Sequence, residues 1–163
     1  MAKVLCYSEK EFKELMKKNG WLEEKDLPEN VAIISIIGGD DCIKGFFEVR
    51  GEEISHWFKN SNDQILNLEF DDVTEEVYIQ GYRIYPMSMD QAKEAVKFIE
   101  KNVGKDFYIH CRAGKSRSQA FVRFILDFFP DCYSEKEINL DNPPITPNID
   151  VLAKLKRVYW FGE

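Results

Sequence analysis

The residues of this sequence that are best suited to do chemistry gather in one short segment of its second half. That segment reads His110-Cys111-Arg112-Ala113-Gly114-Lys115-Ser116-Arg117-Ser118. The apolar run 107–109 before it predicts a strand, and the pattern after it predicts a helix. In a loop between a strand and a helix, backbone N–H groups converge at the helix N-terminus and bind an oxyanion such as phosphate. We therefore expect an anion-binding loop here.

Cys111 and Arg117 are expected to act together on a bound phosphate. The converging amides, the helix dipole and the nearby cations favour the thiolate form of Cys111, which makes it the expected nucleophile. The planar guanidinium of Arg117 can bind two phosphate oxygens at once, a fit that lysine lacks. Gly114 lets the backbone curl without a Cβ clash. The alternative is that Cys111 is an inert buried thiol, but this does not account for the companion arginine and glycine.

The spacing His-Cys-x5-Arg-Ser resembles the active-site loop of the cysteine-based protein tyrosine phosphatase superfamily. The ending Ser116-Arg117-Ser118 looks most like the dual-specificity branch, including its small bacterial and viral members. Direct identity covers only the segment 110–118, although the expected order of strands and helices fits the family for most of the chain. The residues before 31 carry no diagnostic match.

The resemblance implies a metal-independent phosphatase that needs no cofactor. Cys111 would attack phosphorus and form a cysteinyl-phosphate, while Arg117 and the loop amides hold the transferring group. By the same resemblance, Ser118 helps to release the thiolate and His110 fixes the loop. The phosphate-binding loop would comprise Arg112, Ala113, Gly114, Lys115, Ser116 and Arg117.

A phosphatase of this kind needs a general acid, because an aryl or alkyl oxyanion is a poor leaving group. The family takes it from an aspartate upstream of the cysteine, which here means Asp71 or Asp72. The apolar positions of the strand expected at 65–72 are in phase with Asp72, so we favour Asp72 and keep Asp71 as the alternative. The 38 residues between Asp72 and Cys111 exceed the expectation for small members. Three more acidic residues therefore stay in play: Glu75, Glu76 and Asp90.

Several other residues have two interpretations. Arg112 and Lys115 either contact additional phosphates, as similar cations do in lipid and inositol phosphatases of the superfamily, or lie solvated on the rim of the loop. The remaining thiols either include a resolving cysteine for oxidised Cys111 or serve packing; they are Cys6, Cys42 and Cys132. Three aromatic residues either wall the substrate pocket or belong to the core: Trp57, Tyr82 and Tyr85.

The elements that must position this loop alternate between strands and helices. Capping boxes predict helices that start after Ser8 and after Ser88, and Thr146 before Pro147 predicts the start of a last helix. The run 31–37 predicts a strand buried on both faces. A helix with apolar residues at 120–128 follows the loop and ends at Pro130, after which we expect a loop rich in Asp, Asn and Pro. This order predicts an α/β fold, a three-layer αβα sandwich around a mainly parallel sheet, with ligands at the carboxyl ends of the strands.

Composition sets the class of protein. A length of 163 residues with 44% hydrophobic and 31% charged residues predicts one globular domain, residues 1–163. The net charge of −7 disfavours a broad nucleic-acid-binding face. No apolar stretch is long enough to span a membrane, and the N-terminus lacks the apolar core of a secretory signal, so we expect a cytoplasmic location. The four cysteines form no C-x-x-C pair, which favours reduced thiols over a zinc site.

Rival functions fit the loop less well. A nucleotide-binding P-loop would need glycine where Ile109 stands. Rhodanese-type sulfurtransferases usually have a shorter loop, and low-molecular-weight phosphatases carry theirs near the N-terminus. A pseudophosphatase that only binds phosphorylated partners would not need both Cys111 and Arg117. We therefore expect a protein tyrosine or dual-specificity phosphatase acting on a phosphorylated protein or another phosphomonoester. A phosphoinositide, an inositol phosphate and an RNA 5′ phosphate stay open as substrates.

Overall fold

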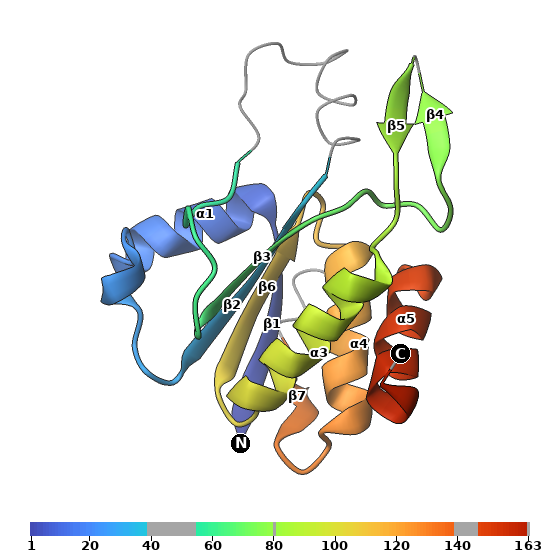
Figure 1. Cartoon of the computed structure of the whole chain (residues 1–163). Helices are drawn as coiled ribbons and strands as arrows, with labels where there is room; N and C mark the ends of the chain where they lie inside the picture. The colour runs from blue at the N-terminus through green and yellow to red at the C-terminus, as the bar shows by residue number, and fades with distance from the viewer. Residues whose placement is uncertain (39–54, 80, 139–146, 163) are drawn as a thin grey trace.

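A computed structural model describes residues 1–38, 55–79, 81–138 and 147–162 of the chain. Its centre is a five-stranded sheet with helices on both faces (Figure 1). The strands lie in the order β3-β2-β6-β1-β7, and every neighbouring pair is parallel. They are β1 (Ala2–Ser8), β2 (Val31–Ile37), β3 (Ile65–Glu69), β6 (Asp106–Cys111) and β7 (Tyr133–Ile138). The predicted α/β sandwich around a parallel sheet is confirmed.

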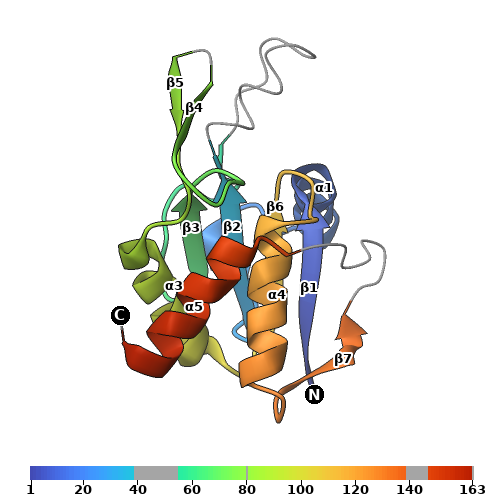
Figure 2. The same ribbon diagram turned by 90° about the vertical axis from the view of Figure 1, so that its right-hand side faces the viewer.

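Helices form a layer on each side of the sheet. The helix α1 (Glu9–Asn19) covers one face, with the short 3-10 turn η1 (Glu24–Asp26) beyond its end. The helices α3 (Met89–Asn102), α4 (Arg117–Phe128) and α5 (Ile149–Phe161) cover the other face (Figures 1 and 2). The side chains of β2 alternate between the two layers: Ile33 packs with Phe12 of α1, whereas Ile34 and Ile36 join the core beneath α3 and α4.

The two predicted capping boxes are present. At α1, the Ser8 hydroxyl accepts the Glu11 N–H at 3.2 Å, and the Glu11 carboxylate accepts the Ser8 N–H at 2.9 Å. Ser88 and Gln91 make the same reciprocal pair at α3. Each box satisfies N–H groups that the first turn of a helix leaves without an intrahelical partner. No helix in the described part of the chain is long and apolar enough to cross a membrane.

Sequence patterns did not reveal four of the strands. β1 lies inside the sheet between β6 and β7, with Val4 and Cys6 fully buried. β7 forms a polar edge of the sheet directly after α4, where only a loop was expected. The strands β4 (Val77–Ile79) and β5 (Tyr82–Ile84) pair as an antiparallel hairpin. This hairpin and α3 lie in the connection between Asp72 and Cys111.

Two predicted boundaries were wrong. β3 ends at Glu69 and does not reach Asp72, because the Asp71 N–H donates to the Tyr85 carbonyl at 2.8 Å and draws the chain away from the sheet. The last helix begins at Ile149 with Asn148 as its N-cap, so Pro147 precedes the helix. Thr146 and Cys42 lie outside the described residues.

Candidate functional site

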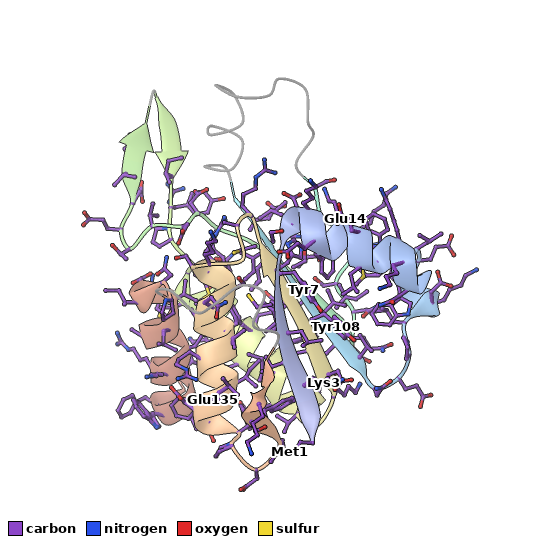
Figure 3. All side chains as sticks on the ribbon, turned by 180° about the vertical axis from the view of Figure 1, so that it is seen from behind. Met1, Lys3, Tyr7, Glu14, Tyr108 and Glu135 are labelled. Carbon is purple, nitrogen blue, oxygen red and sulfur yellow. The ribbon has the colours of Figure 1, made fainter. Side chains whose placement is uncertain are left out.

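The segment 112–116 connects the central strand β6 to α4 at the carboxyl edge of the sheet (Figure 2). β1 runs parallel to β6, with Tyr7 and Tyr108 stacked side by side at 6.2 Å between ring centroids (Figure 3). This pairing puts the end of β1 against the loop. Gly114 has a φ of +71°, and a Cβ there would lie 2.7 Å from backbone atoms of Tyr7 and Ser8. The loop therefore needs glycine at this position, in agreement with the role expected for Gly114.

Cys111 is the last residue of β6, and its side chain packs in the core cluster that includes residues of α4. The residue is 2% exposed, and its sulfur accepts the Gly114 N–H at 3.3 Å. The Ser118 hydroxyl lies 3.0 Å from the same sulfur. A backbone amide and a hydroxyl at the N-terminus of α4 thus both contact the Cys111 sulfur.

Cys6 of β1 lies on the other side of Ser118. Its sulfur donates to the Ser118 hydroxyl oxygen at 3.0 Å, and burial raises the pKa of Cys6 to about 12, so it stays a protonated thiol. Because Cys6 supplies the hydrogen for its contact with Ser118, the hydroxyl hydrogen of Ser118 can point toward Cys111. Cys132 is half-buried.

Arg117 is the first residue of α4 and reaches across to the chain after β3. It is 3% exposed, and one of its terminal nitrogens donates to the Phe70 carbonyl at 2.9 Å. This bond ties the guanidinium to the segment that carries Asp71 and Asp72. The loop with the thiol and the segment with the acidic residues are therefore fixed to one another by a buried cation.

The two candidate acids have different surroundings. Asp71 is fully buried, and its carboxylate accepts the Tyr85 N–H at 2.8 Å. Asp72 is partly exposed, and its Oδ1 accepts the Ser116 hydroxyl at 2.7 Å. The sequence pattern placed Asp71 on the polar side of the strand and Asp72 in phase with its apolar side, which was wrong because β3 ends at Glu69, before both residues. The contact with Ser116 nevertheless brings Asp72 to the loop.

Asn148 is a site residue that sequence reasoning missed. Its side-chain amide donates to Oδ1 of Asp72 at 2.9 Å, and its own N–H donates to the Ser116 carbonyl at 3.1 Å. Its side-chain oxygen accepts the first N–H groups of α5, including that of Asp150 at 3.0 Å. Asparagine is a favoured N-cap, so the sequence held a signal for the helix start, but the contact with Asp72 depends on the tertiary fold.

The other candidate acids lie apart from these contacts. Glu75 is exposed, and Glu76 accepts hydrogen bonds from Arg83 on the hairpin. These bonds hold the pKa of Glu76 below its usual range. Asp90 is exposed in the first turn of α3, where a negative charge suits the helix dipole.

The cations of the loop differ from one another. Arg112 donates to the Glu9 carboxylate at 2.9 Å, and Glu9 is only 5% exposed. Burial opposes the ionisation of Glu9, but hydrogen bonds from Lys13 and Arg112 outweigh it and hold the pKa of Glu9 below its usual value. Lys115 and Ala113 are exposed. Arg112 is therefore attached to the start of α1 through a buried carboxylate.

His110 occupies the layer between the sheet and α1. It is 1% exposed and stacks on Phe12, with 4.3 Å between ring centroids. Its Nδ1 lies 3.4 Å from the Cys111 carbonyl oxygen, and its Nε2 lies 2.6 Å from the Ser35 hydroxyl. Burial lowers the pKa of His110 to about 4, so the ring is neutral at physiological pH.

The aromatic residues considered for the wall of a substrate pocket lie partly in the core and partly at the surface. Trp57 packs in the α1 layer and donates its indole N–H to the Trp21 carbonyl at 2.9 Å, which fits the core interpretation. Tyr85 is 38% exposed and lies under the Arg83 guanidinium. The side chain of Tyr82 lies outside the described residues.

Comparison of the chain with protein-family models, with curated proteins and with solved structures gave no match. Among the described residues, no group of three or more His, Cys, Asp or Glu side chains is placed to hold a metal ion. A thiol contacted by an amide and a hydroxyl, a buried guanidinium and a partly exposed carboxylate lie around one strand-to-helix junction.

Proposed function

We propose that this protein is a phosphomonoester hydrolase of the protein tyrosine or dual-specificity phosphatase type, acting through a cysteinyl-phosphate intermediate. One observation carries the proposal: the Cys111 sulfur meets the Gly114 N–H and the Ser118 hydroxyl at the N-terminus of the helix that begins with buried Arg117. Cys111 then supplies a nucleophile, the loop amides and the Ser118 hydroxyl form an anion cradle, and Arg117 supplies a fixed cation at the same strand-to-helix junction.

The reaction has two displacements at phosphorus. In the first, the Cys111 thiolate attacks, an S–P bond forms while the bond to the leaving oxygen breaks, and Asp72 gives that oxygen its proton. In the second, water attacks phosphorus, its proton passes to the Asp72 carboxylate, and the S–P bond breaks. Ser118 donates a hydrogen bond to the departing thiolate. Arg117 and the loop amides hold the phosphoryl oxygens throughout.

The contacts of the acid support its part in this scheme. Asp72 is held by Ser116, which belongs to the loop itself, and by Asn148, which also binds the loop through its backbone. A carboxylate fixed to the anion loop by hydrogen bonds is positioned rather than free to rotate, and a positioned acid lowers the entropic cost of proton transfer. A protein that only binds phosphate would not need such an acid.

A phosphorylated protein is the proposed substrate class. Binding of additional phosphates, as a phosphoinositide or an inositol phosphate requires, would call on Arg112 and Lys115. Arg112 is already bonded to the buried Glu9 carboxylate, so recruiting it would cost an existing charge-assisted hydrogen bond. The arrangement favours a substrate with one phosphate at the loop.

The proposal is tested by turnover of a small aryl phosphate with a metal chelator present, followed by phosphotyrosine and phosphothreonine peptides. We expect Cys111→Ser to abolish turnover and vanadate to inhibit the unaltered protein by occupying the anion cradle. Cys132→Ser, which alters a half-buried thiol away from the loop, is the matched control and should keep full activity. Undiminished hydrolysis by Cys111→Ser would overturn the proposal.

A further inference from the structure

The two ring nitrogens of His110 link the nucleophile to the neighbouring strand. β2 pairs with β6 in a register that puts Ser35 directly opposite His110. The Ser35 hydroxyl lies 2.6 Å from Nε2 of the ring, while Nδ1 lies 3.4 Å from the carbonyl oxygen of Cys111. Since both His110 and Ser35 are almost fully buried, water does not compete for these contacts.

The same hydroxyl continues the chain of contacts to a second histidine. Oγ of Ser35 lies 2.8 Å from Nδ1 of His56. The side chain of His56 is 11% exposed, and its Nε2 lies 3.9 Å from the Glu69 carboxylate at the end of β3. The contacts therefore run from His56 through Ser35 and His110 to the carbonyl group of Cys111.

The available donors and acceptors allow only one direction for this row of hydrogen bonds. A carbonyl oxygen only accepts, so Nδ1 of His110 carries the hydrogen. The buried ring is neutral, so its Nε2 has a lone pair and accepts the hydroxyl hydrogen of Ser35. The Ser35 oxygen is then left to accept the Nδ1–H of His56, whose pKa burial also lowers. Each hydrogen bond thereby selects the tautomer that the next one needs.

We propose that Ser35 and His56 are positioning residues that hold the Cys111 loop in its reactive arrangement by acting through His110. In a trans peptide the C=O and N–H groups point in opposite directions. A Cys111 carbonyl held toward His110 therefore directs the following N–H, that of Arg112, away from the histidine, as an anion cradle requires. The inference rests on the proposed function, because it assigns two further residues to the same loop.

The test follows alkylation of Cys111 by iodoacetamide against pH, quantified by mass spectrometry on the peptide that carries this residue. Ser35→Ala should raise the pH midpoint of alkylation by about half to one pH unit, as expected for the loss of one buried hydrogen bond. At pH values below the midpoint, this shift lowers the alkylation rate about three- to tenfold. His56→Ala should give a smaller shift in the same direction. His56→Asn keeps an N–H donor near the position of Nδ1, so its pH midpoint of alkylation should stay near that of the unaltered protein.

A double variant separates positioning from general destabilisation. If His56 acts only through Ser35, the combined Ser35→Ala and His56→Ala variant should match Ser35→Ala alone. Ile36→Val, the next residue on β2 but facing the other layer, is the control: it should lower stability without moving the midpoint. The variants leave unchanged the other charged groups near the two rings, which are Glu9 and Lys13 at His110 and Glu69 and Glu9 at His56.

The outcomes distinguish this inference from the proposed function. An unchanged midpoint in Ser35→Ala, or shifts that add in the double variant, would overturn the positioning role even if the protein hydrolyses phosphate esters. A shifted midpoint in a protein that hydrolyses no phosphate ester would sustain the positioning of Cys111 and refute the proposed function.

Discussion

The adjacent residues Asp71 and Asp72 allow a matched test of the general acid. Asp72→Asn removes the transferable proton and keeps the shape of the side chain. In the protein, Oδ1 of Asp72 accepts hydrogen bonds from Ser116 at 2.7 Å and from Asn148 at 2.9 Å. An asparagine oxygen can accept both, so we expect the free energy of unfolding to change by less than about 1 kcal/mol.

The effect of Asp72→Asn on rate should depend on the leaving group. Loss of a general acid costs about 10²- to 10⁴-fold when the leaving oxygen needs a proton. An alkyl or unactivated aryl phosphate should show this full loss, whereas an activated aryl phosphate should be affected much less. The basic limb of the pH–rate profile should flatten in the same variant, because that limb reports loss of the acid's proton.

Asp71→Asn should give the opposite result. The fully buried Asp71 side chain accepts the Tyr85 N–H at 2.8 Å, and an asparagine oxygen could still accept it. The asparagine NH2 group, however, would place new donors in this buried position, and a buried donor without a partner costs about 1–3 kcal/mol. We therefore expect a fall of this order in the free energy of unfolding, measured by urea titration, with the leaving-group dependence preserved. Glu75→Gln, at an exposed position on the same connection, is the control and should change neither. If Asp71→Asn flattens the basic limb while Asp72→Asn leaves it intact, the assignment of the acid is wrong.

Three further predictions concern the loop. Arg117→Lys keeps the charge but loses the planar fork, so turnover should fall at least about a hundredfold; near-normal rates would show that Arg117 does not clamp phosphate. The double variant Arg112→Ala and Lys115→Ala should lose similar activity on a polyphosphorylated substrate and on a small aryl phosphate, and a selective loss on the former would assign these cations to extra phosphates. The folded-state pKa of His110, about 4 against 6.5 for the free side chain, means that the folded state resists protonation. Stability should be complete above about pH 6.5 and fall by about 2–3 kcal/mol on acidification to about pH 4.5, and His110→Gln should lose this part of the pH dependence.

The sequence predicted the features that depend on neighbouring residues. Capping boxes marked the starts of α1 and α3, because a serine and a residue three positions later act on the same turn. The continuous β-branched run 31–37 predicted β2 with its observed bounds. Gly114 was expected to let the loop backbone curl without a Cβ clash, and its φ of +71° agrees with that role.

The features that were missed depend on distant contacts. β1 buries only Val4 and Cys6, and it pairs with β6 and β7, which lie far along the sequence. β7 is too polar to signal a strand, since an edge strand carries charges that oppose aggregation. Asn148 meets Asp72 across 75 intervening residues, and Ser35 meets His110 across a strand pair, so no local pattern could reveal either contact.

The central claim is tested most directly by trapping the covalent intermediate. The protein is mixed with an activated aryl phosphate, quenched in acid within the first turnover, digested and analysed by mass spectrometry. The proposed mechanism predicts one added phosphoryl group on the peptide that carries Cys111, with more of it in Ser118→Ala, in which release of the thiolate is slowed. A phosphoryl group on another residue, or full turnover by Cys111→Ser with no labelled peptide, would contradict it.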